Sequence, residues 1–337
     1  MEDALGLNLQ TYHSLEYQEV SWTTAGEFYG AGTVAAEYCS VEPFRPLRGT
    51  WQHGWIPSHL AVHPELVIMS SQPPQKRHYC WVARKDQALY LHQRGFKKAK
   101  AIGLPIVYLK EENINRIPGS LLVMPPHSNN ATTHDWDFAS YAEEIARLKK
   151  EFSNIVISIH PIDWAKGYWI DDFRRYGFDI IQGINGFDKN ALKRLQILMS
   201  SFEYVTTNSF GSAIAYAAYF GAKVSIFGRF AQYKEEDIRN DPLCVRAPEM
   251  IQPLVTAISE KELRSHYPKL FCHPLEAREN TDWACIELGH NNKVTPEEMR
   301  YLFGFNLVNK WIWQMRRKLP APIKRTMRNV QASFRSA

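Results

Sequence analysis

The sequence has no apolar run as long as the roughly 18 residues that a membrane-spanning helix needs. Residues 1–17 contain neither a basic start nor an apolar stretch, so we expect no secretory signal there. Internal repeats and low-complexity stretches are also missing, because proline and glycine are spread along the chain. These absences favour a globular protein that works in the cytoplasm.

The five cysteines are scattered and form no CxxC pair. Their odd number and irregular spacing argue against a disulfide framework and against a zinc site, and they indicate a reducing compartment. The histidines are dispersed and no metal-binding triad stands out, so we expect no metal.

Acidic residues are missing from residues 309–337, which contain eight lysines and arginines. The whole chain has a net charge of +5, so the remainder is net negative and the positive charge belongs to this tail. Trp311 and Trp313 lie beside the cations, a pattern typical of an interfacial helix on anionic lipid, broken at Pro320 and Pro322. A solvated basic tail or a nucleic-acid arm are the alternatives.

What is present fits two α/β domains. The chain has 337 residues, 45% of them hydrophobic and 22% charged, which is enough for two domains of ordinary size. We expect an N-terminal Rossmann-like domain over 1–115, a C-terminal Rossmann-like domain over 116–308 with a cleft between them, and the basic tail over 309–337.

Strand and helix patterns alternate in the first domain, which favours a parallel sheet covered on both faces. Strands are predicted over 49–55, 65–69, 78–83 and 99–109, with helices over 27–38 and 85–94. The polar segment 110–118 is predicted to connect the domains.

The second domain has the clearer alternation. Strands are predicted over 120–126, 154–160, 178–183, 204–207 and 223–227, with helices over 138–152, 167–176, 190–201 and 213–220. This order predicts a doubly wound sheet whose ligands lie at the carboxyl ends of its strands. Farther along, Thr295 to Glu298 has the sequence of a capping box with proline at the first helical position.

Polar residues follow four of these strands. They are His127 and Ser128, then His160 and Pro161, then Asn185, and finally Asn208, Ser209, Gly211 and Ser212. The last group begins a helix with small polar residues, and Ser209 is predicted to be its N-cap. Free amides, hydroxyls and a helix dipole together bind phosphate. The alternative is an ordinary βαβ unit in which the serine only caps the helix.

Two of these motifs resemble those of bacterial surface-polysaccharide transferases. His160-Pro161 resembles a His-Pro motif, and Thr207 to Ser212 resembles a serine-rich motif, of GT-B glycosyltransferases that use CMP-sugars, namely sialyltransferases and Kdo transferases. The resemblance covers about residues 120–228 well and 49–109 loosely. The acidic glycine motif that some CMP-sugar users carry in the N-terminal half has no clear copy here.

The resemblance implies a metal-independent glycosyltransferase of capsule or O-antigen assembly, with His160, Ser209 and Ser212 around the donor phosphate. CMP is the favoured nucleotide, and UDP, GDP or dTDP remain possible. His127 and Ser128 are predicted to line the same pocket. The acceptor is a glycan or a lipid-linked glycan, which fits a peripheral position at the inner face of the plasma membrane.

The sequence offers several candidates for the catalytic base. His53, at the end of a predicted strand facing the cleft, is the first candidate. Asp135 and Asp137, in a polar loop on the other side, are alternatives as base or nucleophile, and Glu42 is a further acid. Two other functions remain at this stage: a nucleotide-sugar epimerase of the same architecture, which needs several carboxylates around the sugar, and a non-catalytic sugar-phosphate-binding protein.

Overall fold

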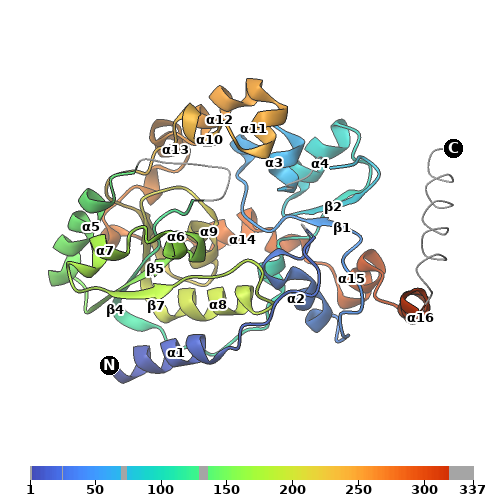
Figure 1. Cartoon of the computed structure of the whole chain (residues 1–337), viewed down its shortest axis with the longest axis horizontal. Coiled ribbons are helices and arrows are strands. Elements are labelled where there is room, and N and C mark those ends of the chain that lie inside the picture. The colour runs from blue at the N-terminus through green and yellow to red at the C-terminus, as the bar shows by residue number, and fades with distance from the viewer. Residues whose placement is uncertain (1, 25, 70–73, 129–135, 319–337) are drawn as a thin grey trace.

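Two parallel β-sheets organise the chain (Figure 1), of which the computed structural model describes residues 2–24, 26–69, 74–128 and 136–318. The first sheet has the strand order β1-β2-β3 and the second the order β6-β5-β4-β7-β8. All neighbouring strands run parallel. The strands are β1 Gly49–Trp51, β2 Tyr79–Val82, β3 Ala99–Ala101, β4 Ile117–Val123, β5 Asn154–Ile159, β6 Asp179–Gln182, β7 Phe202–Thr207 and β8 Lys223–Ile226. The predicted mixed α/β class is confirmed.

Helices connect and cover these strands. They are α1 Glu2–Ser14, α2 Ala31–Tyr38, α3 Pro64–Ile68, α4 Lys85–Gln93, α5 Phe138–Arg147, α6 Pro161–Lys166, α7 Ile170–Arg174, α8 Ala191–Ser201, α9 Ser212–Tyr219, α10 Glu235–Ile238, α11 Pro242–Arg246, α12 Ile251–Ala257, α13 Glu260–His266, α14 Thr281–Glu287, α15 Pro296–Phe303 and α16 Leu307–Lys318. Thr295 caps α15 through the amide of Glu298, with Pro296 next to it, as the capping box predicts.

The five-stranded sheet is buried on both faces because its strands are apolar at consecutive positions. Leu122 of β4 belongs to the core cluster that includes residues of α8 and α9. Leu121 and Val123, which point to the other face, pack with Tyr141 of α5 and Phe173 of α7. This alternation places helices on both faces, as in a doubly wound sheet.

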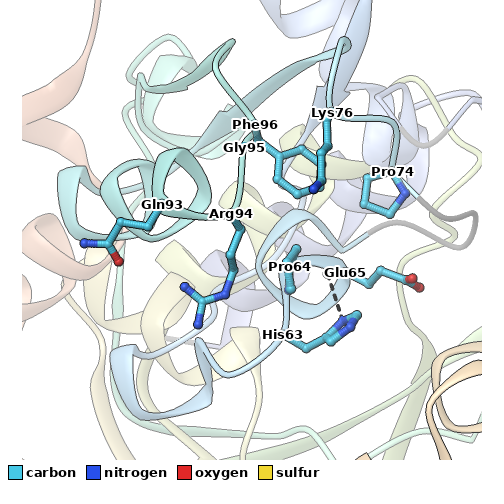
Figure 2. A pocket seen from close by; sticks show the side chains of 9 residues that line it. All are labelled: His63, Pro64, Glu65, Pro74, Lys76, Gln93, Arg94, Gly95 and Phe96. Atoms are coloured by element: carbon cyan, nitrogen blue, oxygen red, sulfur yellow. Dashed lines mark hydrogen bonds between the residues drawn. The ribbon is translucent and has the colours of Figure 1, made fainter.

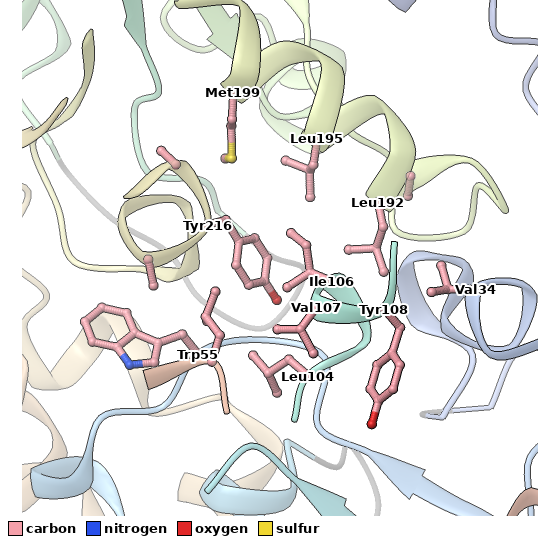
Figure 3. Close-up of a cluster of buried hydrophobic side chains, with 14 of the residues drawn as sticks. Val34, Trp55, Leu104, Ile106, Val107, Tyr108, Leu192, Leu195, Met199 and Tyr216 are labelled. Atoms are coloured by element: carbon pink, nitrogen blue, oxygen red, sulfur yellow. The ribbon is translucent and has the colours of Figure 1, made fainter. Parts of the chain in front are cut away.

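A continuous apolar core joins the two sheets. Figure 3 shows Leu104, Ile106 and Val107, which follow β3, facing Leu195 of α8 and Tyr216 of α9. The two halves therefore share a buried apolar surface.

Near both ends of the described residues, the chain packs on the opposite half. Helix α1 lies along α8 (Figure 1), where the Tyr12 hydroxyl donates a 2.7 Å hydrogen bond to the Gln182 carbonyl. Near the other end, the amide of Leu104 donates to the carbonyl of Leu288, and the rings of Trp81 and Phe303 lie 4.4 Å apart. Residues after α14 thus pack on the first sheet, although the predicted boundary groups them with the second.

One predicted element is of the wrong type, and two others have the wrong bounds. The strand predicted over 65–69 is instead helix α3, Pro64–Ile68, because Pro64 fixes the first helical φ and the His63 ring accepts from the Glu65 amide. The strand predicted over 99–109 ends at Ala101, and a 3-10 helix follows at Pro105–Tyr108. The helix predicted over 167–176 is shorter, Ile170–Arg174, and α6, which was not predicted, precedes it and ends at Gly167 with a φ of 74°.

The last described helix, α16, lies at the edge of the molecule (Figure 1). Its large apolar side chains Leu307, Val308, Trp311 and Met315 are exposed. None of the helices within the described ranges is long and apolar enough to cross a membrane.

Candidate functional site

A cavity of about 670 Å³ lies at the carboxyl ends of the strands and has walls from both halves of the chain. His53 and Gly54, which follow β1, form part of one wall. His127, His160 and Ser209, which follow β4, β5 and β7, line the same cavity from the second half. In the strand order of the second sheet, β4 and β7 are neighbours at the point where the order reverses, which is where doubly wound sheets bind ligands.

His160 is a neutral hydrogen-bond donor. Its Nδ1 accepts a 3.3 Å hydrogen bond from the amide of Ile162 as the N-cap of α6, so the ring proton is on Nε2. Burial, and next the nearby His127, lower the pKa of His160 to about 3. At neutral pH the ring therefore has no charge and donates through Nε2 alone.

His127 has the opposite arrangement. Its ring stacks on that of His160 with the centroids 4.1 Å apart and the planes 18° from parallel. Its Nδ1 lies 2.9 Å from the Ser128 carbonyl oxygen, which can only accept, so Nδ1 carries a proton. Nε2 remains for a ligand or a second proton, and the side chain is exposed while His160 is half-buried.

His53 lines the same cavity from the other half of the chain. Burial lowers the pKa of His53 to about 4, so it is unprotonated at neutral pH. Its Nδ1 is buried and has no partner among the described residues. Phe28 packs against the ring, at 5.2 Å between centroids, and the Tyr216 hydroxyl donates to the His53 carbonyl at 2.8 Å. A neutral imidazole held in this way can accept a proton through a free ring nitrogen.

The start of α9 contributes small polar groups. Gly211 is the N-cap, so the predicted cap at Ser209 is wrong. Ser209 lies two residues earlier, 7% exposed, and lines the cavity with Gly211 and Ser212. The Ser212 oxygen accepts a 2.9 Å hydrogen bond from the Trp55 amide, which ties α9 to the loop after β1.

Four of the predicted site residues do not line the cavity. Ser128 is buried and bonds to Asp163, Pro161 is the first residue of α6, and Asn208 donates to the Arg229 carbonyl at 2.8 Å. Asp137 is an exposed N-cap of α5, with its carboxylate 3.0 Å from the Ser140 amide and 3.3 Å from Arg229. Asp135 lies outside the described residues.

Ser158 was not predicted and belongs to the site. It is 4% exposed, lines the cavity, and its hydroxyl has no partner among the described residues. A Cβ on Gly183, on the neighbouring strand end, would lie 3.1 Å from this hydroxyl, so glycine keeps the space beside it open. The signal was a lone serine inside the apolar strand over 154–160.

The described carboxylates that line the cavity are already engaged. Glu65 pairs with Arg246, and Asp241 accepts from the Leu243 amide at 2.8 Å as the N-cap of α11. Within the described ranges, no three histidine, cysteine or acidic side chains lie close enough to hold a metal ion.

A second pocket, of about 690 Å³, lies on the outside of the first half (Figure 2). Figure 2 shows Lys76, Arg94 and Glu65 around it, with the His63 ring bonded to the Glu65 amide. None of the site residues predicted from the sequence lines it. The predicted site residues that line a cavity therefore belong to the cavity at the strand ends.

Comparison with known proteins gives no relative to guide the assignment: no family model matches the chain, and no curated protein matches it.

Proposed function

We propose that the protein is a GT-B-type glycosyltransferase, which transfers a sugar from a nucleotide donor to a surface glycan. One observation carries the proposal: His160, Ser209 and the first turn of α9 line one cavity together with His53 from the other half of the chain. Two parallel sheets with a cavity between their strand ends support the GT-B fold.

The donor phosphate binds at the second sheet. A hydrogen bond from His160 Nε2, the Ser209 hydroxyl and the amides at the start of α9 all suit an anionic group, because each offers a proton or a positive partial charge. The phosphate gains charge as the sugar leaves. Donors fixed in place stabilise that charge by several kcal/mol, without a metal.

The acceptor binds at the first half, where His53 removes the proton from its hydroxyl. Its neutral ring and unpaired Nδ1 support this role. Asp137 is less suited because it is exposed, caps α5 and does not line the cavity.

CMP is the proposed nucleotide, and capsule or O-antigen assembly the proposed process. Both rest on the resemblance of His160-Pro161 and the turn from Thr207 to Ser212 to motifs of CMP-sugar users. An epimerase is disfavoured because Glu65 and Asp241, the described carboxylates of the cavity, are held by Arg246 and by the start of α11.

The first experiment measures nucleotide binding. CMP, UDP, GDP and dTDP are titrated by calorimetry, and we expect CMP to bind and to raise the thermal midpoint. The variant H160A removes a hydrogen bond to a charged group, so its Kd should rise about 10- to 100-fold. H13Q, a substitution on the exposed face of α1, is the control.

Turnover separates the remaining candidates. Release of nucleotide from a CMP-sugar only when an acceptor glycan is present indicates transfer. Release without acceptor indicates hydrolysis or epimerisation. If UDP binds and CMP does not, the CMP assignment is wrong while sugar transfer stands; if none of the four binds, the proposed function is wrong.

We also propose that α16 holds the protein at an anionic membrane surface, where a lipid-linked acceptor lies. Leu307 and Trp311 are 84% and 62% exposed, and Lys310 is in the same helix. An exposed apolar face beside cations suits the interface of anionic lipid.

Sedimentation with vesicles tests the membrane proposal. The full chain should sediment with phosphatidylserine vesicles and much less with phosphatidylcholine vesicles. Deleting residues 309–337 should abolish sedimentation, and W311S should weaken it while leaving the cations in place. Unchanged sedimentation of the deletion variant would show that α16 is not the anchor.

A further inference from the structure

Two histidines at adjacent strand ends hold their protons on opposite nitrogens. His160 receives the Ile162 amide at Nδ1, which leaves its proton on Nε2. His127 donates from Nδ1 to the Ser128 carbonyl, which leaves Nε2 without a fixed role. Both residues line the cavity. The backbone partners, rather than the solvent, therefore decide which nitrogen of each ring faces a ligand.

The partner of His127 is itself fixed by a buried cluster. The Ser128 amide lies 3.1 and 3.2 Å from the two carboxylate oxygens of Asp163, and its hydroxyl also donates to that carboxylate. Lys166 Nζ donates to the hydroxyl oxygen of Ser128 at 2.9 Å. Asp163 is fully buried in α6, the helix that His160 caps. One element thus positions both rings.

The surroundings favour a charge on His127 over one on His160. Two positively charged rings stacked at 4.1 Å would repel each other, so only one of the two histidines is charged at a time. His160 is half-buried and its pKa is lowered, whereas His127 is exposed to water. The other described ionisable groups on these elements and along the same wall are Asp163, Lys166, Tyr233 and Asp241.

We propose that His127 is the acid of the reaction, which protonates the departing phosphate from Nε2, while His160 stays neutral and only donates a hydrogen bond to it. This inference rests on the proposed glycosyl transfer. Asp163 and Ser128 are positioning residues, because they act through the carbonyl that holds His127.

In the transfer step, each bond that breaks is matched by one that forms, and each proton has a donor and an acceptor. The bond from the anomeric carbon to the phosphate oxygen breaks, and its electron pair goes to that oxygen, which takes the proton from His127 Nε2. The acceptor oxygen forms the new bond to the anomeric carbon, and its proton goes to His53. Exchange with water then returns a proton to His127 and removes one from His53.

Nuclear magnetic resonance of the full chain with nitrogen-15-labelled histidine tests the proton positions without any substrate. We expect neutral His127 to carry its proton on Nδ1, because that nitrogen lies 2.9 Å from the Ser128 carbonyl oxygen. His160 should keep its proton on Nε2 and should not titrate between pH 5 and 8. H127Q and H160Q assign the signals. Titration of His160 in this range, or a neutral His127 with its proton on Nε2, overturns the assignment.

The pH dependence of transfer tests the role. H127Q should lower kcat at least 100-fold and abolish the fall in kcat at alkaline pH, as expected for loss of a general acid. H160Q should mainly raise the KM for donor and keep that fall. If wild-type protein binds and turns over the donor and H127Q keeps the wild-type pH profile, this assignment alone is wrong. If wild-type protein binds no nucleotide, the proposed function is wrong and the assignment falls with it.

Discussion

Burial shifts the pKa values of three ionisable side chains. It raises the pKa of Glu27 to about 7 and lowers those of His53 and His160 to about 4 and 3. The lowered histidine pKa values and the raised glutamate pKa change stability with pH in opposite directions. Below about pH 6.5 the unfolded chain binds protons at both histidines before the folded protein does, so acid lowers stability. Above about pH 4.5 the unfolded chain ionises Glu27 first, so alkali lowers it too.

We expect the variant E27Q to lose the decrease in stability that ionisation of Glu27 causes as the pH rises. Glu27 is buried and accepts a 2.7 Å hydrogen bond from the Leu47 amide, which a glutamine oxygen can also accept. Between pH 4.5 and above pH 7 its ionisation costs the folded protein roughly 3 kcal/mol. Urea unfolding should therefore show that E27Q gains free energy of unfolding relative to the wild-type protein between pH 5 and pH 8, because the opposing histidine contribution is unchanged.

The matched control is E37Q, at an exposed position in α2. It should keep the wild-type difference between the two pH values. If E27Q kept that difference as well, the carboxyl of Glu27 would not be the group that titrates, whatever its burial.

At the scale of elements, the site depends on the close approach of the loop after β1 to α9. A Cβ on Gly54 would lie 2.8 Å from the Ser212 oxygen and 2.9 Å from Met69 Cε. We expect G54A to displace Ser212 from its bond to the Trp55 amide, which costs about 1 to 3 kcal/mol of stability. It should also weaken nucleotide binding, because Ser212 lines the cavity.

Thermal unfolding compares G54A with G211A. A Cβ on Gly211 meets nothing within 4 Å, so G211A should change the thermal midpoint little. Equal midpoints for the two variants would mean that Met69 moves aside at no cost and that Ser212 keeps its place.

The sequence predicts the second sheet much better than the first. Its strands are apolar runs separated by amphipathic helices, and all five were placed within three residues at each end. In the first half the apolar runs are short and fit either type of element. The strand predicted over 65–69 is instead helix α3 because of the cap at His63 and the proline at Pro64, which outweigh the β-branched content of the run.

The sequence predicts the location of those site residues that directly follow a strand. His127, His160 and Ser209 follow three neighbouring parallel strands of one sheet, so their position at one edge follows from the topology. His53 follows β1 of the other sheet, and its place in the same cavity depends on how the two halves pack. Side-chain direction was not predictable. Ser128 points away from the cavity into the Asp163 cluster, and the tautomers of the two stacked rings depend on backbone partners that only the folded chain provides.

At the scale of the whole molecule, the two halves are held together by the exchange of their ends. Glu287 of α14 joins the returning chain to the first half, because its Oε2 lies 2.6 Å from Trp55 Nε1 and 2.6 Å from Arg84 Nη1. The Arg84 side chain is 8% exposed, so the ion pair is largely shielded from water.

We expect E287A to destabilise the whole chain rather than one half. Removing the acid leaves buried donors on Arg84 and Trp55, which costs about 3 kcal/mol. Because α1 packs on α8 and the chain after α14 packs on the first sheet, the loss should move a single unfolding transition, seen alike by tryptophan fluorescence and circular dichroism. E297A removes an exposed pair at 3.8 Å and should shift the midpoint little. Two separate transitions, with E287A moving only one of them, would show that the halves fold independently and that the exchanged ends do not couple them.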